Sequence, residues 1–193
     1  MKTPLSEREI RRLRSGEIIY LTGTIVTARD AAHKRIRQYL MEGRELPFNL
    51  RGLALFHCGP VVRRVNDKWI VLAAGPTTSI RMEAYECELI EKLGVRFIIG
   101  KGGMGSKTER AMMEHGAAYA MFTGGAAVLA AKHIKEVKNV EWMDLGIPEA
   151  VWTFKVENFG PLIVAIDSHG NNLFERVIKR AKRRRTQILK DLL

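Results

Sequence analysis

Three short segments of the sequence place a cationic side chain close to the end of an apolar stretch. Arg29 lies in VTARDAAH, Arg81 in AAGPTTSIRM and Lys101 in GKGGMG. Where a strand ends in a tight turn, backbone N–H groups become free to bind an anion, and a nearby guanidinium or ammonium strengthens that binding. Thr77 and Thr78, in the expected first turn of a helix, add free N–H groups and hydroxyls. All three segments therefore predict anion binding.

Each segment also has a purely structural interpretation. An arginine at a helix start is commonly a solvated surface residue, and a run of Thr and Ser is commonly a helix cap. The glycines between 100 and 105 favour a function more strongly, because they cost chain entropy unless the backbone requires them. His33 lies four residues after Arg29 on the same helix face, where a histidine is commonly just partly buried. No histidine spacing indicates a metal, so no metal ligand is expected in this chain.

The glycine-rich segment nearly has the sequence of a phosphate-binding loop. Gly100 and Gly105 have the spacing of G-x-x-x-x-G-K-[ST], but Ser106 stands in place of the lysine and Lys107 follows one residue late. A shift of one residue turns a helical side chain by about 100°. The sequence therefore disfavours a nucleotide-hydrolysing enzyme, whose nucleotide affinity would depend on Lys107.

The elements that must position these residues alternate between strand and helix. The β-branched stretch 17–28 predicts a strand, and Asp30 then caps a helix that runs to about Met41. Two apolar runs follow, each closed by Gly-Pro, at 53–62 and 68–76. Further strands are expected at 95–100, 118–125 and 159–167, and helices at 80–94, 108–115, 126–134 and from 171 onward. This alternation predicts a single α/β domain.

The composition is that of a globular protein with one sizeable core. The chain has 193 residues, of which 46% are hydrophobic and 7% aromatic, which excludes disorder throughout. No run approaches the roughly 18 to 20 apolar residues of a membrane span, and the N-terminus lacks a signal-peptide core, so a cytoplasmic protein with no membrane partner is expected. Cys58 and Cys87 are too far apart in sequence to form a metal motif and are expected to be reduced.

The net charge of +11 lies mainly at the two ends of the chain. Residues 1–15 contain five Lys or Arg and two acidic residues, and residues 175–193 contain eight against two, so residues 16–174 carry a net charge of only +2. Both ends are expected to be basic helices. They suggest a nucleic-acid-binding module as an alternative function, but no aromatic residues interleave with the basic ones and no known binding motif is present. A nucleic acid partner is therefore disfavoured.

Several of these motifs, in this order, resemble class I fumarases. They are TARDAAH, HCGP with AAGPTTSIRM, GKGGM, EWMDLGIPEAVW and ID-x-HGN. More narrowly, the chain resembles the separate beta subunit of two-subunit fumarate hydratases and of the similar L-tartrate dehydratases. The resemblance extends from about residue 10 to about residue 175 and leaves out only the basic tail.

The resemblance implies a swivelling β/β/α domain at 16–174, and the charge pattern adds the basic helices 1–15 and 175–193 on either side of it. It implies a hydro-lyase that reversibly hydrates fumarate to L-malate, with L-tartrate dehydration as the alternative. It also implies a 4Fe-4S iron–sulfur cluster held by three cysteines of a partner alpha subunit, so that this chain is active only in a hetero-oligomer. A homodimer of the isolated chain is also allowed.

The resemblance assigns roles to particular residues. Arg29, Arg81 and Lys101 correspond to residues that bind the substrate carboxylates, Thr77 to a proposed catalytic base and Thr78 to a substrate hydrogen-bond partner. A threonine hydroxyl is a poor base unless its surroundings lower its pKa. Thr77 therefore either removes a proton or only positions water or substrate, while a group on the alpha subunit takes the proton. His33 is a candidate to support these residues from behind.

Overall fold

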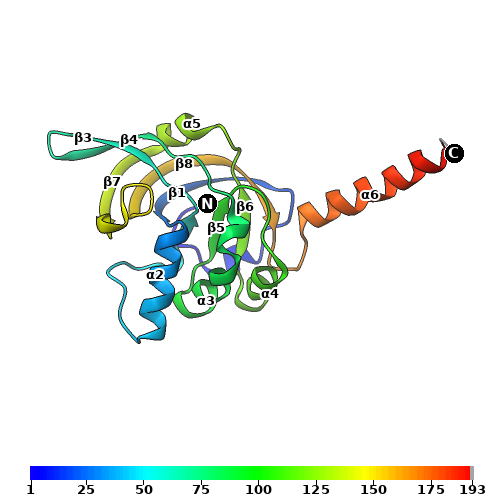
Figure 1. Ribbon diagram of the computed structural model, residues 1–193, viewed down its shortest axis with the longest axis horizontal. Helices are drawn as coiled ribbons and strands as arrows, with labels where there is room; N and C mark the ends of the chain where they lie inside the picture. The colour runs from blue at the N-terminus through cyan, green and yellow to red at the C-terminus, as the bar shows by residue number, and fades with distance from the viewer. Residues whose placement is uncertain (192–193) are drawn as a thin grey trace.

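The computed structural model describes residues 1–191, and its centre is a six-stranded mixed sheet (Figure 1). The strands are, in spatial order, β1 (Ile18–Thr27), β2 (Ala54–Phe56), β5 (Phe97–Gly100), β6 (Ala118–Met121), β8 (Val151–Ile166) and β7 (Ile134–Glu141). The first four strands are parallel to one another, and β8 is antiparallel to β6. Because β8 also pairs with β1, the sheet closes on itself.

Both faces of the parallel strands are buried, and successive residues alternate between two cores. Ile25, Phe56 and Ile99 point to one core, whereas their neighbours in β1, β2 and β5 point to the other. The second core is covered by α2 (Asp30–Met41), α3 (Glu83–Leu93) and α4 (Ser106–His115), which Figure 1 shows on one side of the sheet. Such burial explains why these strands read as continuous apolar runs. The predicted mixed α/β fold is confirmed.

The first core is aromatic and is closed by a hairpin that the sequence patterns did not indicate. The hairpin joins β3 (Val61–Val65) to β4 (Lys68–Ala73), with Asn66 and Asp67 at φ values of 46° and 60° in the turn, as a tight two-residue hairpin requires. Trp69 packs edge-on against Trp152, with ring centroids 5.3 Å apart. The short, small-residue helix α5 (Ala127–Lys132) lies beside β4.

The strand expected at 159–167 is only the second half of β8. The sequence patterns predicted neither the first half of β8 nor any part of β7. β7 alternates irregularly between exposed and half-buried residues, as an edge strand does, and Lys, Glu and Asn occupy its outer positions. Polar edge strands lack the apolar signal on which the expectation relied.

The prediction of a basic helix over 1–15 is wrong in its extent. Ser6 and Glu9 do form the expected capping box, but α1 is the single turn Glu7–Ile10. Beyond this turn the backbone N–H groups find partners outside a helix, since that of Arg14 donates to the Glu17 carboxylate and that of Ser15 to Asp167. The start of the chain instead pairs with β1 through Thr22.

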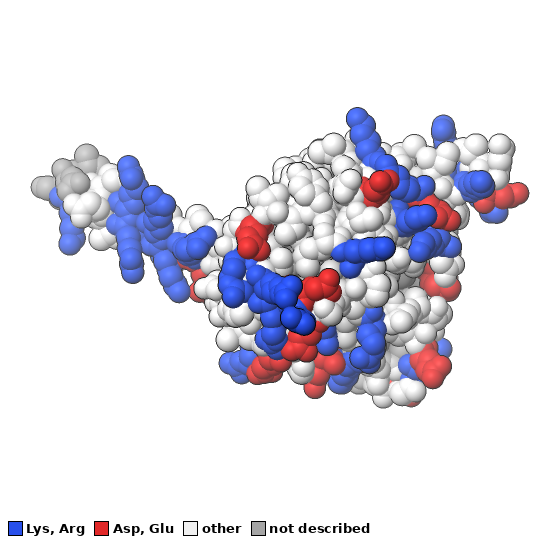
Figure 2. Space-filling view, turned by 180° about the vertical axis from the view of Figure 1, so that it is seen from behind, with Lys and Arg blue, Asp and Glu red and all other residues white. Residues whose placement is uncertain are grey.

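The basic C-terminal helix is present as α6 (Leu173–Asp191), and residues 192–193 of that expectation lie outside the described residues. The Asn172 side chain accepts hydrogen bonds from the first N–H groups of this helix. The helix projects from the body, and its side chains are exposed from Glu175 to Lys190 (Figure 1). Figure 2 shows Lys and Arg along it, whereas acidic residues lie among the basic ones on the visible face of the body. No described helix is long and apolar enough to cross a membrane.

Candidate active site

The parallel pairing of β1, β2 and β5 brings three polar side chains to one edge of the sheet. Arg29 follows the end of β1 by two residues, His57 comes directly after β2, and Lys101 comes directly after β5. The carboxyl ends of parallel strands meet at the same edge, which is where α/β proteins bind ligands. The sequence placed Arg29 and Lys101 at strand ends, and the strand order puts both ends at one edge of the sheet, with the end of β2 between them.

Thr77 and Thr78 lie between the ends of β2 and β5. The Thr77 N–H donates to the His57 carbonyl at 2.6 Å, and the Lys101 N–H donates to the Thr77 carbonyl at 3.2 Å. The Ser79 N–H donates to the Lys101 carbonyl at 3.0 Å. The expectation that this segment offers free N–H groups is therefore wrong for Thr77 and Ser79, because the crossing backbone uses them before the short 3-10 helix η1 (Ser79–Met82) begins.

The side chains at this crossing remain available to a ligand. Thr77 and Thr78 are half-buried and Lys101 is exposed. None of these three side chains forms a hydrogen bond or ion pair with another described residue. The segment therefore contributes hydroxyls and an ammonium, in place of the backbone donors expected from the sequence.

Arg29 precedes α2 and Arg81 lies in η1, and carboxylates orient both of them. Arg81 binds both oxygens of Asp30 in a bidentate pair, with Nε 2.9 Å from Oδ1. Arg29 Nε lies 3.3 Å from Oε1 of Glu149, whose other oxygen accepts the Ala31 N–H at 2.9 Å. Burial opposes ionisation of Asp30, but hydrogen bonding and attraction from Arg81 lower its pKa, so Asp30 stays charged. Both guanidiniums are thus held by anionic partners beside each other.

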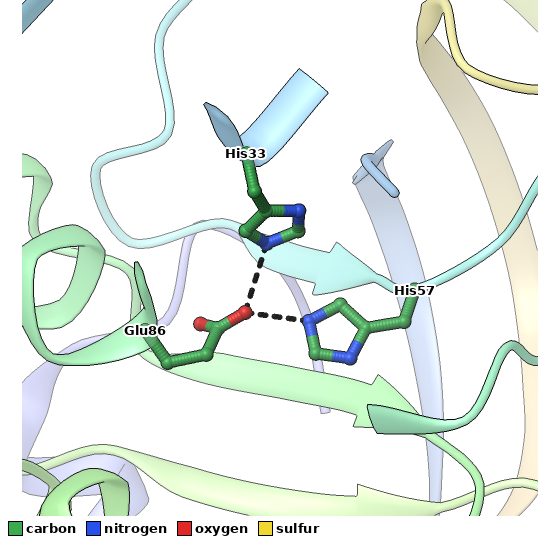
Figure 3. Close-up of side chains that lie close together, drawn as sticks. All are labelled: His33, His57 and Glu86. Atoms are coloured by element: carbon green, nitrogen blue, oxygen red, sulfur yellow. Dashed lines mark hydrogen bonds and ion pairs between the residues drawn. The ribbon is translucent and has the colours of Figure 1, made fainter. Parts of the chain in front are cut away.

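Behind this edge lies a buried group of two histidines and one carboxylate (Figure 3). Glu86 Oε1 accepts hydrogen bonds from His33 Nε2 at 2.9 Å and from His57 Nε2 at 2.6 Å. All three side chains are fully buried. His33 was expected near the site, whereas His57 and Glu86 were missed. Glu86 had a detectable signal, since it shares the buried face of α3 with the apolar residues Leu89 and Ile90.

Burial and the mutual contacts shift the pKa values in this group. Burial by itself raises the pKa of Glu86, whereas charge attraction and hydrogen bonds from the two histidines lower it to about 2. The carboxylate is therefore ionised. Burial lowers the pKa of His57, and the attraction of Glu86 opposes that effect only in part.

The same three residues are the only described group of His, Cys, Asp and Glu side chains close enough to be considered as metal ligands. Their ligand atoms fit hydrogen bonds better than a metal. Two atoms that bind one tetrahedral zinc ion at about 2.0–2.1 Å lie roughly 3.3 Å apart, whereas Glu86 Oε1 is 2.6 Å from His57 Nε2. The expectation that this chain holds no metal stays a prediction.

The N-terminus of α4, where a phosphate-binding loop would hold its anion, is occupied by a carboxylate of the protein. Glu83 accepts the N–H groups of Gly105 at 2.7 Å and Thr108 at 3.1 Å, together with the Thr108 hydroxyl at 2.7 Å. These are the donors that a nucleotide phosphate would require. The structure thus adds a second argument against the nucleotide-hydrolysing alternative.

Known proteins of one family are similar to this chain over nearly its whole length. Residues 1–177 match the family described as Fumarase C-terminus. The sequence is 45% identical over 192 residues to the L(+)-tartrate dehydratase subunit beta of Escherichia coli (strain K12), covering 100% of this chain and 94% of that protein. It is 42% identical over 186 residues to the putative L(+)-tartrate dehydratase subunit beta of Methanocaldococcus jannaschii, covering 96% and 95%.

A longer relative contains the same unit. The putative fumarate hydratase class I of Geobacillus stearothermophilus is 44% identical over 180 residues, which are 93% of this chain but 34% of that protein. The unit therefore occurs both as a separate chain and within a longer polypeptide.

Proposed function

The chain belongs to the Fumarase C-terminus family, as a beta subunit of the class I fumarate hydratase and tartrate dehydratase type, and from this premise we propose that it serves an enzyme hydrating fumarate to L-malate. In this proposal it binds the C4 dicarboxylate and closes over a partner alpha subunit that carries a 4Fe-4S cluster. The resulting hetero-oligomer is a cytoplasmic hydro-lyase.

One observation carries the proposal, namely that anion-binding side chains from separate segments meet at one edge of the sheet. A dicarboxylate needs a cation at each end, and Arg29, Arg81 and Lys101 come from the start of α2, from η1 and from the end of β5. Thr77 and Thr78 lie between β2 and β5 with their hydroxyls free of described partners.

The proposed roles follow from this arrangement. Arg29, Arg81 and Lys101 bind the two carboxylates, and Thr78 donates a hydrogen bond to the substrate. Thr77 is the proposed catalytic residue, and the backbone pairing with Lys101 keeps it beside a cationic residue, which favours an ionised hydroxyl. In the alternative role Thr77 positions the reacting water, and a group of the alpha subunit accepts the proton.

The proposal places the iron–sulfur cluster on the alpha subunit because this chain lacks the ligands for it. It has two cysteines in all; Cys58 is fully buried, and burial raises the pKa of its thiol, which disfavours the thiolate that iron requires. When bound by the partner, the cluster would supply a Lewis acid for the substrate hydroxyl. This chain would anchor the carboxylates and exclude water from the site.

L-tartrate is the alternative substrate, because two of the relatives described above are named as tartrate dehydratase subunits. Fumarate and tartrate share the two carboxylates that the cations would bind. They differ in hydroxyl groups, whose recognition depends on pocket contacts that include the partner subunit.

The first test is an anaerobic assay of fumarate and L-tartrate with this chain alone and with a co-expressed iron–sulfur alpha subunit. Loss of fumarate absorbance only in the mixture is the expected result. Lys101→Ala is expected to lower kcat/KM at least about a hundredfold, because it removes a charged substrate anchor. Turnover of tartrate alone would keep the mechanism and change the substrate.

Lys107→Ala is the matched control, since Lys107 is an exposed lysine six residues further along the same loop and helix start. It is expected to retain activity. Full activity of this chain without iron, or equal losses in the two lysine variants, would contradict the proposal. Nucleotide binding that disappears in Lys107→Ala would favour the phosphate-loop alternative instead.

A further inference from the structure

A buried chain of hydrogen bonds joins the backbone at Arg29 to the backbone just after Lys101. On one side of Glu86, the Arg29 carbonyl lies 2.7 Å from His33 Nδ1, and His33 Nε2 lies 2.9 Å from the Glu86 carboxylate. On the other side, the same carboxylate lies 2.6 Å from His57 Nε2, and His57 Nδ1 lies 3.0 Å from Ser79 Oγ. The Tyr119 hydroxyl then lies 3.1 Å from Ser79 Oγ and 2.8 Å from the Gly102 carbonyl. We refer to this chain of hydrogen bonds as the buried relay.

The buried relay touches each segment that carries a proposed substrate anchor. It begins at the carbonyl of Arg29, passes Ser79, which directly follows Thr78, and ends at Gly102, which directly follows Lys101. Its five side chains, those of His33, His57, Ser79, Glu86 and Tyr119, are all fully buried. The relay therefore lies directly beneath the sheet edge at which the anchors meet.

The acceptors at the Arg29 end determine where the protons lie. The Arg29 carbonyl and the Glu86 carboxylate can only accept hydrogen bonds, so both nitrogens of His33 carry a proton. His33 is thus an imidazolium that balances the charge of Glu86. His57 donates from Nε2 to the same carboxylate, and its Nδ1 shares a hydrogen bond with the Ser79 hydroxyl. The Tyr119 hydroxyl lies within hydrogen-bond distance of both Ser79 Oγ and the Gly102 carbonyl and donates its single proton to one of them at a time.

The end of β5 lies in close contact with the relay. A Cβ atom added at Gly100, the residue before Lys101, would lie 1.8 Å from Ser79 Oγ and 3.2 Å from His57 Nδ1. Only glycine fits there, so the end of β5 is in direct contact with the relay. The position of Lys101 is thereby tied to the positions of Ser79 and His57.

We propose that Glu86 is a positioning residue for substrate binding, which holds Arg29 through His33 and the Lys101 segment through His57, Ser79 and Tyr119. Glu86 does not touch the substrate. It sets the separation of anchors that come from the ends of different strands, and this separation must match the distance between two carboxylates. The inference rests on the proposed function, because a dicarboxylate is the ligand whose two ends it would fit.

The test is Glu86→Gln in the complex with the alpha subunit. Glutamine keeps the shape but removes the charge, so His33 loses its counter-ion, becomes neutral and gives up one of its two hydrogen bonds. KM for the dicarboxylate is expected to rise at least about fivefold while kcat changes less than about twofold, because anchors of this kind act equally in the ground state and the transition state. Unchanged KM, or a fall in kcat alone, would overturn the inference.

Glu88→Gln is the matched control on the same helix, because Glu88 forms surface ion pairs with Arg37 and Lys92 outside the relay. It is expected to leave KM within about twofold of the unaltered complex. Equal effects of the two variants would show a general response to lost helix charge and would overturn the role of Glu86.

A second measurement, on the full chain alone, does not depend on activity. Nitrogen-15 NMR of the histidines is expected to show His33 with two N–H protons and His57 with a proton at Nε2, and to show His33 with a single proton in Glu86→Gln. A neutral His33 in the unaltered chain, or a transition metal bound stoichiometrically by His33 and His57, would overturn the relay. If the spectra are as expected but the complex turns over no dicarboxylate, the result contradicts the proposed function and leaves the relay in place.

Ser79→Ala is the milder variant if Glu86→Gln does not yield folded protein. It removes only the hydroxyl between His57 and Tyr119 and breaks the arm toward Lys101. We expect KM to rise at least about threefold with kcat unchanged, and His33 to keep both protons. Unchanged KM in Ser79→Ala would overturn the inference.

Discussion

At the scale of single residues, Glu86 combines full burial with an ionised carboxylate. A carboxylate without partners in a fully buried position would be strongly unfavourable. Here Oε1 receives two imidazole N–H groups, whereas Oε2 has no hydrogen-bond partner among the described residues. Buried charges of this kind add little net stability compared with an apolar core but are costly to break. Their presence therefore favours a role in positioning.

The lowered pKa of Glu86 predicts how stability depends on pH. Because the pKa falls from 4.5 in the unfolded chain to about 2 in the folded protein, the contribution of Glu86 is fully present above about pH 4.5 and is lost as the pH falls toward 2. At neutral pH it is on the order of 3 kcal/mol. Denaturant unfolding of the unaltered chain and Glu86→Gln at pH 7, 5, 4 and 3 checks this expectation.

The difference between the two proteins should shrink as the pH falls, since the charge of Glu86 stabilises only when it is ionised. Comparing the two curves removes the contributions of other carboxylates with lowered pKa, such as Asp30 and Asp167. His57, whose pKa is also lowered, contributes above its unfolded value of 6.5 and less as the pH falls below it. A difference that stays constant from pH 7 to pH 3 would contradict the assignment.

At the scale of elements, α3 positions two separate parts of the site. Glu83, in its first turn, binds the start of α4, and Glu86, three residues later, binds the histidines after β2 and in α2. The glycine-rich loop after β5 is thereby held at its far end by Glu83 and at its near end by the relay. A single helix thus fixes the loop that carries Lys101.

Glu83→Ala is expected to lower the free energy of unfolding by about 1–3 kcal/mol. The change removes three hydrogen bonds at the N-terminus of α4, one of them to a fully buried threonine hydroxyl, together with the favourable charge at the positive end of the helix. Denaturant unfolding at neutral pH measures the effect.

Glu91→Ala provides the comparison for this prediction, since Glu91 is an exposed glutamate on the same helix. Its change in stability is expected to stay within about 0.5 kcal/mol. Comparable losses in the two variants would mean that helix propensity, and not the cap of α4, accounts for the effect of Glu83.

At the scale of the whole molecule, the positive charge is concentrated in α6, outside the candidate site. Residues 16–174 carry a net charge of only +2, whereas α6 carries a concentration of Lys and Arg and projects from the body (Figures 1 and 2). Like charges along a helix repel each other, so this helix gains little from its own charge pattern.

Removing residues 182–193 is expected to shift the midpoint of thermal unfolding by less than about 2 °C. The side chains from Lys182 to Lys190 are exposed, so their removal uncovers no part of either core. Differential scanning calorimetry of the full and shortened chains checks this, and a larger shift would mean that the end of α6 stabilises the body.

The same pair of proteins tests the nucleic-acid alternative. That alternative requires binding to random oligonucleotides that weakens with salt, is lost with residues 182–193 and is unaffected by Arg81→Ala. Absence of binding at low salt in the full chain would exclude it.

The sequence by itself determined the local features. Apolar patterns located β1, the strands around Phe97 and Tyr119, and the helices α2, α3 and α4, and they marked an apolar run around Phe56, because these patterns depend only on neighbouring residues. The sequence also placed Arg29 and Lys101 at strand ends, where side chains and loop backbone are accessible. The order of the motifs was enough to identify the family.

Only the tertiary structure decided what depends on distant pairing. His33 and Glu86 are 53 positions apart and His57 and Glu86 are 29 apart, so no local pattern predicts that they share one carboxylate oxygen. The crossing of Thr77 between β2 and β5, which uses the N–H groups expected to be free, likewise follows from strand order. The physical reason is that periodicity records which face of an element is buried, whereas the partner on that face is set by how the sheet closes.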